Sequence, residues 1–424
     1  MKIDLRNYAI VTGAYWADTL VDGATRLLVL FYFYERGYSA FEVASLFVFY
    51  EVFGIVTNLV GGWVAARLGL RTTLLAGLST QIVALSMLAF APISWLVVPY
   101  VMTSQALSGI AKDLTKMSSK SAVKLLVPED AHGELYRWVA LLTGSKNALK
   151  GVGFFLGGLL LTVVGFRVSV LILLALIGTA LLVVLTMARG QLAVPNPRAK
   201  FRGMFSNNRS VNMLAAARVF LFASRDVWFV VGLPVYLSSV LGWSFWQAGA
   251  FLAVWVIGYG VVQASAPRTT RRWGGPDGPD GNVATWLAFV LAVPLAATAI
   301  GLTTDLPPGP IVVVGLIAFG VVFALNSAVH SFLILRYAEG DRVAMNVGFY
   351  YMANACGRLL GTVLSGALYE AGGLTWCLWA SVILVLTSGT FARFLPRSPA
   401  ATGQTSILPE DVPAGLPRPT SGSG

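Results

Sequence analysis

Long apolar runs, interrupted by glycine and proline, dominate the first 395 residues of the chain. A helix needs about 20 apolar residues to cross a bilayer, whereas a membrane β-barrel would show segments of ~10 residues that alternate apolar and polar positions. Only the helical pattern is present. Hydropathy and breaking residues predict twelve membrane spans, at 8–31, 41–64, 72–92, 95–117, 134–164, 168–188, 211–238, 245–266, 283–303, 310–334, 343–368 and 373–395. Turn-forming residues separate them, namely Gly37, Gly69, Pro92, Gly165, Gly242, Pro307-Pro308 and Gly372-Gly373.

Composition supports an all-α polytopic membrane protein with short loops. Of the 424 residues, 56% are hydrophobic and 12% are charged, the latter about half of the ~25% of a soluble domain. This balance excludes a soluble enzyme and a disordered chain. The sequence has no Walker loop, no HExxH motif and only two histidines, so we expect no cofactor, no metal site and no enzymatic activity.

The lysines and arginines orient the spans. The chain carries 30 of them against 19 acidic residues, a net charge of +11. With the N-terminus inside, nearly all basic residues between spans fall on the inner side, and the outer loops hold only Arg36 and Arg167. Because cytoplasmic loops are enriched in basic residues, we predict a multi-pass protein of the cytoplasmic (inner) membrane with both termini in the cytoplasm. The bilayer then accounts for the positive charge, and no nucleic-acid partner is expected.

An internal repeat divides the spans into two sets of six. Asp22 and Asp226 lie 204 residues apart, and the segment 37–41 matches 242–246 at an offset of 205. Six plus six spans with a duplicated pattern predict the major facilitator fold, in which the substrate binds near the midplane between the two halves.

The predicted organisation has four parts, which are an N-terminal half at 1–188, a basic cytoplasmic linker at 189–210, a C-terminal half at 211–395 and a disordered cytoplasmic tail at 396–424. The segment 62–71 resembles the loop motif that this superfamily carries between its second and third spans. It has Ala66 where the motif has an acidic residue.

Ionisable residues inside the spans are candidates for function, because a charge at bilayer depth is costly unless it faces a cavity or a partner. In the first span Asp18, Asp22 and Arg26 follow at four-residue intervals and so share one helix face. Glu51 lies near the middle of the second span. Two interpretations stay open for these acids. One is an ion pair such as Asp22 with Arg26, and the other is a proton carrier such as Asp18 or Glu51, since burial favours the neutral form of a carboxyl group.

The fifth span carries two lysines on one face. Lys146 and Lys150 are four residues apart, with Asn147 beside the first. Like charges at this spacing repel each other, so an anion is expected between or opposite them unless one lysine is neutral. That anion is either an acidic side chain, Asp22 or Glu51, or a bound ligand, and we favour a ligand.

The second half repeats this theme. Arg218 and Arg225 are seven residues apart in the seventh span, and the adjacent Asp226 is placed to neutralise Arg225. Asn354 and Arg358 share a face of the eleventh span.

Charges near the span ends, among them Lys112 and Lys116, are interpreted as topology signals. Among the other charges inside the spans, with Arg137 near the inner boundary, cations outnumber acids by seven (Arg26, Arg137, Lys146, Lys150, Arg218, Arg225 and Arg358) to four (Asp18, Asp22, Glu51 and Asp226). This surplus predicts a cavity for a small, multiply charged, oxygen-rich anion, since arginine binds such groups in bidentate fashion and lysine acts as a point charge. The candidate substrate-binding residues are Arg26, Lys146, Asn147, Lys150, Arg218, Arg225, Asn354, Arg358 and Tyr15. The four acids are candidates for proton coupling or ion pairing. For His330 a proton-carrying role stays open, and a satisfied core histidine is favoured.

Four long strings carry a family resemblance. They are NYAIVTGAYWADTLVDGATRLLVLFYF (7–33), FYEVFGIVTNLVGGW (49–63), the segment 104–158 that begins SQALSGIAKDLTKMSSK, and FLFASRDVWFVVGLPVYLSSVLGWSFWQAG (220–249). These strings resemble the ArsJ family of organoarsenical efflux permeases. The resemblance implies export of 1-arseno-3-phosphoglycerate, which forms when glyceraldehyde-3-phosphate dehydrogenase uses arsenate in place of phosphate. It therefore implies arsenate resistance, with that dehydrogenase as a functional partner.

Two other functions stay open on the sequence. An exchanger of organophosphates for phosphate, in the same superfamily, would also use buried arginines. A non-transporting membrane sensor would carry an attached signalling domain or a long structured loop, and the sequence indicates neither. The glycines of the run 151–158 predict close helix contact, and this run resembles a glycine motif of superfamily antiporters.

Overall fold

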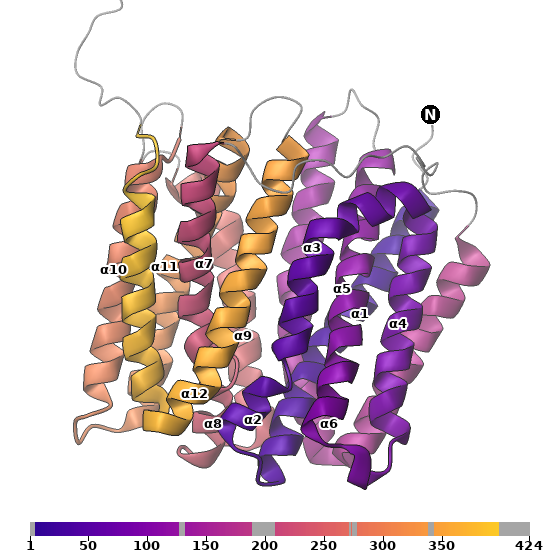
Figure 1. Cartoon of the computed structure of the whole chain (residues 1–424), viewed down its shortest axis with the longest axis horizontal. Coiled ribbons are helices and arrows are strands. Elements are labelled where there is room, and N and C mark those ends of the chain that lie inside the picture. The colour runs from indigo at the N-terminus through magenta and orange to yellow at the C-terminus, as the bar shows by residue number, and fades with distance from the viewer. Residues whose placement is uncertain are drawn as a thin grey trace, which may run out of the picture.

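The computed structural model describes residues 5–126, 132–188, 208–270, 273, 278–337 and 343–397. Throughout this part every regular element is a helix (Figure 1). The α-helices are α1 (Leu5–Glu35), α2 (Ala40–Ser45), α3 (Val48–Leu68), α4 (Leu70–Phe90), α5 (Val98–Leu126), α6 (His132–Met187), α7 (Arg209–Phe229), α8 (Gly232–Ser239), α9 (Phe245–Thr270), α10 (Gly281–Gly301), α11 (Pro308–Tyr337) and α12 (Val343–Ala392), and a 3₁₀ turn lies at Ile93–Trp95. The predicted all-α class is confirmed.

The two longest helices each contain a turn at glycine. Gly165 within α6 has φ 74°, and Gly373 within α12 has φ 67°. Only glycine adopts this left-handed conformation without a steric penalty, which is why the chain turns at these positions. Each kink separates two helices. If α6 and α12 are each counted as two helices, and if α2 is counted with α3 and α7 with α8, the described residues form twelve helical passes, as predicted.

Seven helical stretches in the described ranges are long and apolar enough to cross a membrane by length and composition. Two of them include the glycine turns of α6 and α12. The helices α1, α5 and α7 are not among the seven, and each carries several charged residues.

The helices form two bundles that lie side by side. Helices α1 to α6 make up one bundle and α7 to α12 the other, and the short helices α2 and α8 lie at the same end, at the bottom of Figure 1. The bundles meet where α6 packs against α9 and where α2 and α3 pack against α12. This is the two-half arrangement that the internal repeat predicts.

Glycines on α6 let three helices approach backbone to backbone. A Cβ atom on Gly153 would lie less than 3.0 Å from the backbone oxygen of Leu20 on α1, and Gly157 is equally close to α1. A Cβ atom on Gly158 would meet the backbone oxygen of Phe245, the first residue of α9. The helix α6 therefore presents one glycine face to its own half and another to the opposite half, as small residues at helix interfaces allow.

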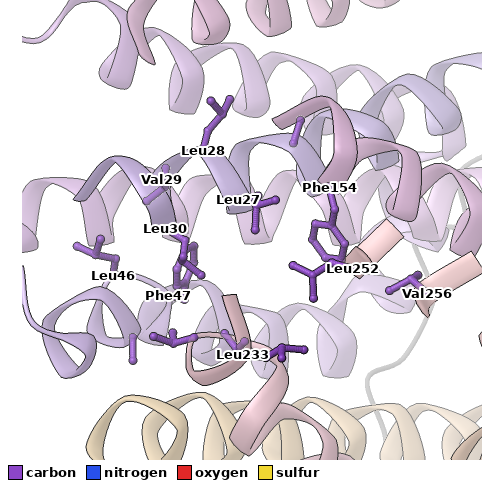
Figure 2. Packing of buried hydrophobic residues seen from close by; sticks show 14 of the residues in the cluster. Leu27, Leu28, Val29, Leu30, Leu46, Phe47, Phe154, Leu233, Leu252 and Val256 are labelled. Atoms are coloured by element: carbon purple, nitrogen blue, oxygen red, sulfur yellow. The ribbon is translucent and has the colours of Figure 1, made fainter. Parts of the chain in front are cut away.

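A buried apolar cluster continues across this junction. It includes Leu27 of α1, Phe154 of α6 and Leu252 of α9, which Figure 2 shows around one space. Because residues of both halves belong to the same cluster, apolar packing joins the halves at this level. Polar side chains lie beyond it and form the cavity described below.

Some predicted boundaries differ from the structure or lie beyond it. The fourth span, predicted to end at 117, belongs to a helix that continues to Leu126, so Lys112 lies within the bundle and not at its edge. The predicted linker at 189–210 lies outside the described residues up to 207, and α7 begins at Arg209. Most of the predicted tail, from 398 onward, also lies outside them, and the limits of the two halves remain predictions.

The glycine contact between α6 and α9 gives a first testable prediction. Gly158→Leu should lower the free energy of unfolding by about 1–3 kcal/mol, because the new side chain has no room against the Phe245 backbone. Thermal unfolding of the detergent-purified protein measures the change. Gly178→Leu, in the second part of α6, is the matched control, because nothing lies within 4 Å of its added Cβ atom. Equal unfolding temperatures for the two variants would contradict the close contact.

Candidate substrate cavity between the two halves

A cavity of about 230 Å³ lies between the halves and is lined by residues of six long helices and of α8. The helices α1 and α6 contribute from one half, and α7, α9, α11 and α12 from the other. Leu27, Leu30 and Phe154 form part of its apolar wall. The volume lies below the ~300–1,000 Å³ of drug-sized sites, so it suits a small ligand.

Basic side chains dominate the polar part of the lining. Six cations line the cavity (Arg26, Lys146, Lys150, Arg218, Arg225 and Arg358) together with one acid, Asp226. The amides Asn147 and Asn354 also line it, so the structure brings together eight of the nine residues that the sequence indicates for substrate binding. Tyr15 is not among the lining residues, and it lies 2% exposed within α1.

One buried carboxylate holds two of these cations. Glu51 of α3 is 1% exposed, and its Oε1 accepts a hydrogen bond of 2.9 Å from Nη2 of Arg26. Nη2 of Arg358, on α12 in the other half, lies 2.6 Å from Oε1 and 2.5 Å from Oε2. Glu51 therefore bridges the two halves. The Asp22–Arg26 pair that the sequence allowed is not formed, because Arg26 is directed toward α3.

Asp22 instead takes part in a network behind the cavity. It accepts a hydrogen bond from the hydroxyl group of Tyr50, and Nζ of Lys112 donates to the same hydroxyl oxygen at 2.8 Å. Nζ of Lys112 also lies 4.0 Å from the centre of the Tyr50 ring. The contact thus links α1, α3 and α5 inside the N-terminal half.

The role of Lys112 was missed because a basic residue near a span end is read as a signal of topology. A usable signal was present, since Lys112 and Lys116 repeat the four-residue spacing of Lys146 and Lys150. Lys116 donates to Asp113 at 2.6 Å, and that carboxylate also accepts from two side chains of α3. These contacts fix α5 against α3.

In the C-terminal half one arginine is paired and the other is not. Nε and Nη2 of Arg225 each lie 2.6 Å from Oδ1 of Asp226, as the sequence suggested. Arg218 is 4% exposed and donates to the backbone and side-chain oxygens of Ser327, both at 3.1 Å. Its guanidinium group lies 4.0 Å from the ring centre of Phe222. Among the described residues no carboxylate lies within ion-pair distance of Arg218.

His330, near Arg218, is fully buried on α11. Neither of its ring nitrogens, nor either side-chain polar atom of Asn326 one turn away, has a hydrogen-bond partner in the part of the chain described. The interpretation of His330 as a core residue is confirmed by its burial, but the expectation that its ring nitrogens are hydrogen-bonded is wrong for the described residues.

Lys150 and Lys146 lie on the α6 wall of the cavity. Nζ of Lys150 lies 5.6 Å from the ring centre of Phe154, and within the described ranges no carboxylate pairs with it. The alternative in which Asp22 or Glu51 pairs directly with Lys150 is thus not observed. The side chain of Arg137, the remaining cation of the sequence tally, lies outside the described part of the chain.

Sequence reasoning also missed polar residues of α9. Tyr259 and Gln263 line the cavity one helical turn apart, and both lie within hydrogen-bonding distance of Ser327 Oγ. Asn147 of α6 donates to Gln263 at 3.4 Å across the two halves. The available signal was the four-residue spacing of the tyrosine and the glutamine, which places both on one face of an apolar helix.

The Glu51 bridge gives a second prediction. Glu51→Gln should lower the free energy of unfolding by about 3–5 kcal/mol, because it leaves two buried guanidinium groups without their carboxylate. Denaturation of the purified protein measures the change, with Glu35→Gln, at the exposed end of α1, as the control. If the two variants unfold alike, Glu51 does not neutralise the arginines.

Comparison with known proteins identifies the family. The sequence matches the Major Facilitator Superfamily over residues 11–329, more than half of the chain. It has no match among curated proteins.

Three solved transporters share the fold. The first is a POT family transporter in complex with a thioalcohol-conjugated peptide, with a TM-score of 0.73 and 13% identity over 90% of this chain and 94% of that chain. The second is a D-xylose–proton symporter, with a TM-score of 0.68 and 15% identity over 93% of this chain and 98% of that chain. The third is the human organic anion transporter MFSD10 (TETRAN), with a TM-score of 0.65 and 14% identity over 92% of this chain and 100% of that chain. Identities this low establish a common fold and no common substrate. The chain is a multi-pass membrane transporter that belongs to the Major Facilitator Superfamily.

Proposed function

We propose that this protein exports a small, multiply charged oxyanion from the cytoplasm by alternating access around the cationic cavity. One observation carries the proposal. Among the cations that line the cavity, Arg26 and Arg358 pair with Glu51 and Arg225 pairs with Asp226, whereas no carboxylate of the described residues lies within ion-pair distance of Lys150 or Arg218. A surplus of positive charge at bilayer depth is unfavourable until an anion compensates it.

The two cations that have no ion-pair partner in the described residues lie on opposite sides of the cavity. Lys150 belongs to the N-terminal half and Arg218 to the C-terminal half. An anion with two charged groups that contacts both residues would draw the halves together. Arginine offers paired N–H donors to an oxyanion and lysine a point charge, so the two positions favour oxygen-rich groups over halides.

The Glu51 bridge suggests how binding is linked to movement. A bound oxyanion offers the same kind of oxygen acceptors to Arg26 and Arg358 as Glu51 does. It therefore competes with Glu51 for the arginine that crosses from the other half. In this mechanism substrate binding weakens one contact between the halves while it forms new ones.

The resemblance to ArsJ permeases supplies a specific candidate, 1-arseno-3-phosphoglycerate, which carries a phosphate and an arsenate group. In this proposal glyceraldehyde-3-phosphate dehydrogenase forms the substrate in the cytoplasm and the protein exports it across the inner membrane. Both termini then lie in the cytoplasm. A negative-inside potential favours export of an anion by about 2.3 kcal/mol per charge per 100 mV.

Everted membrane vesicles test the substrate directly. Vesicles containing the protein receive the dehydrogenase, glyceraldehyde-3-phosphate, NAD and arsenate outside, and arsenic inside them is measured over time. Accumulation that requires every component supports the proposal. Accumulation from arsenate alone would identify an arsenate exporter instead. Exchange of a phosphorylated metabolite for phosphate, without arsenic uptake, would support the organophosphate exchanger.

Two cavity variants give the third prediction. Lys150→Gln and Arg218→Gln should each reduce the rate of arsenic accumulation by about tenfold or more, since a hydrogen bond to a charged group contributes about 1.5–3 kcal/mol and each 1.4 kcal/mol is a factor of ten. Arg36→Gln, in an exposed turn after α1, removes the same charge far from the cavity and should leave the rate unchanged. Normal rates in both cavity variants would show that the anion binds elsewhere.

A further inference from the structure

Asp18 stands apart from the other buried acids of the protein. It lies in the middle of α1 and is 1% exposed. Neither of its carboxyl oxygens has a hydrogen-bond partner in the described residues. By contrast, Glu51 is held by two arginines, Asp22 by Tyr50, and Asp226 by Arg225.

Among the groups that face Asp18, Lys112 is the one cation, and it forms no ion pair with Asp18. Asp22 lies one turn further along α1, and Tyr15, whose hydroxyl group also has no partner in the described part, lies nearly one turn before it. From α5, Lys112 and Asp113 face it. The ammonium group of Lys112 is directed to Tyr50.

The other acid near Asp18 is itself neutralised by different groups. Asp113 accepts hydrogen bonds from Lys116, Thr57 and Asn58. The charge of Lys150, on α6, acts on Asp22, and the carboxyl oxygens of Asp18 accept no hydrogen bond from it. No cation is therefore left to pair with Asp18 among the groups that face it.

An ionised carboxylate that is buried without a partner is strongly unfavourable, and the nearby charge of Asp22 adds repulsion. We propose that Asp18 is a proton-binding site, occupied by a proton in this conformation, through which the proton gradient acts on transport. The proton resides on a carboxyl oxygen and returns to water when α1 moves and exposes that face. This role for Asp18 as the coupling site rests on the proposed transport function, whereas its protonation does not.

Infrared spectroscopy tests the protonation without any substrate. The purified wild-type protein near neutral pH should show the C=O stretching band of a protonated carboxylic acid that shifts in D2O. Asp18→Asn should lack this band. Asp113→Asn, which removes a buried but hydrogen-bonded carboxylate, and Asp305→Asn, in an exposed turn, should retain it.

Loss of the band only in Asp18→Asn would support the assignment. A wild-type spectrum without a protonated carboxyl band, or a band that survives in Asp18→Asn, would overturn it. Because asparagine has the size of the protonated acid, the variant is expected to fold, and size-exclusion chromatography of each variant checks this.

Transport in everted vesicles tests the coupling. The rate of arsenic accumulation in the wild type should change when nigericin collapses an imposed pH gradient, whereas the rate for Asp18→Asn should be the same with and without the gradient. A wild type that ignores the gradient, or an Asp18→Asn variant that responds as the wild type does, would overturn the coupling role. If the wild type accumulates no arsenic at all, the proposed substrate is wrong, and the infrared band still decides whether Asp18 holds a proton.

Discussion

The carboxylate of Glu51 sets the charge balance on which the cavity depends. It contacts guanidinium groups from both halves, Arg26 at 2.9 Å and Arg358 at 2.5 Å, and is itself 1% exposed. Without it, two arginines would face each other at bilayer depth with no anion between them, which is costly. Glu51 is not itself a lining residue, whereas both arginines that it neutralises line the cavity. The same residue thus supports the fold and keeps the cavity attractive to anions.

The helix α1 separates its own acids from its arginine. The helix α1 contributes Arg26 to the cavity but directs Asp18 and Asp22 into the bundle, where α5 and α3 surround them. Tyr50 lies between the two groups, since its hydroxyl contacts Asp22 while its ring lies 5.1 Å from the guanidinium group of Arg26. This separation keeps the local field in the cavity positive although three acids lie on neighbouring turns of α1 and α3. It also leaves a buried polar network of Asp22, Tyr50 and Lys112 outside the cavity lining.

Much of the fold could be predicted from the sequence because membrane helices are marked by length and apolarity. The turns at Gly165 and Gly373 were predicted from the same breakers that the structure uses. Of the site, the charged residues that line the cavity could be predicted, because a charge in an apolar helix must face a cavity or a partner. Their partners could not. The four-residue spacing on one helix favoured a pair of Arg26 with Asp22. The observed pair with Glu51 depends on how α3 packs against α1, and the spacing of residues within one helix carries no information about that packing.

Lys112 and Tyr15 illustrate the same limit in opposite directions. The first looked like a cytoplasmic topology signal and lies in a buried network, because α5 continues well past the predicted end of its span. The second was assigned to the cavity from its place in the first span and faces the bundle interior instead. In both cases the deciding quantity is the rotation of a helix about its axis relative to neighbours that are distant in sequence.

The glycine faces of α6 have a consequence for the speed of conformational change. Where α6 meets α9, at Gly158 and Phe245, the contact is backbone against backbone and not interlocked side chains. At this point the two backbones can move relative to each other without a change of side-chain rotamer. Elsewhere side chains join the halves: Phe154 and Leu252 share one apolar cluster, Asn147 donates to Gln263 between α6 and α9, and Arg358 pairs with Glu51 between α12 and α3. A movement of the halves is therefore resisted by these side-chain contacts and not by the glycine contact.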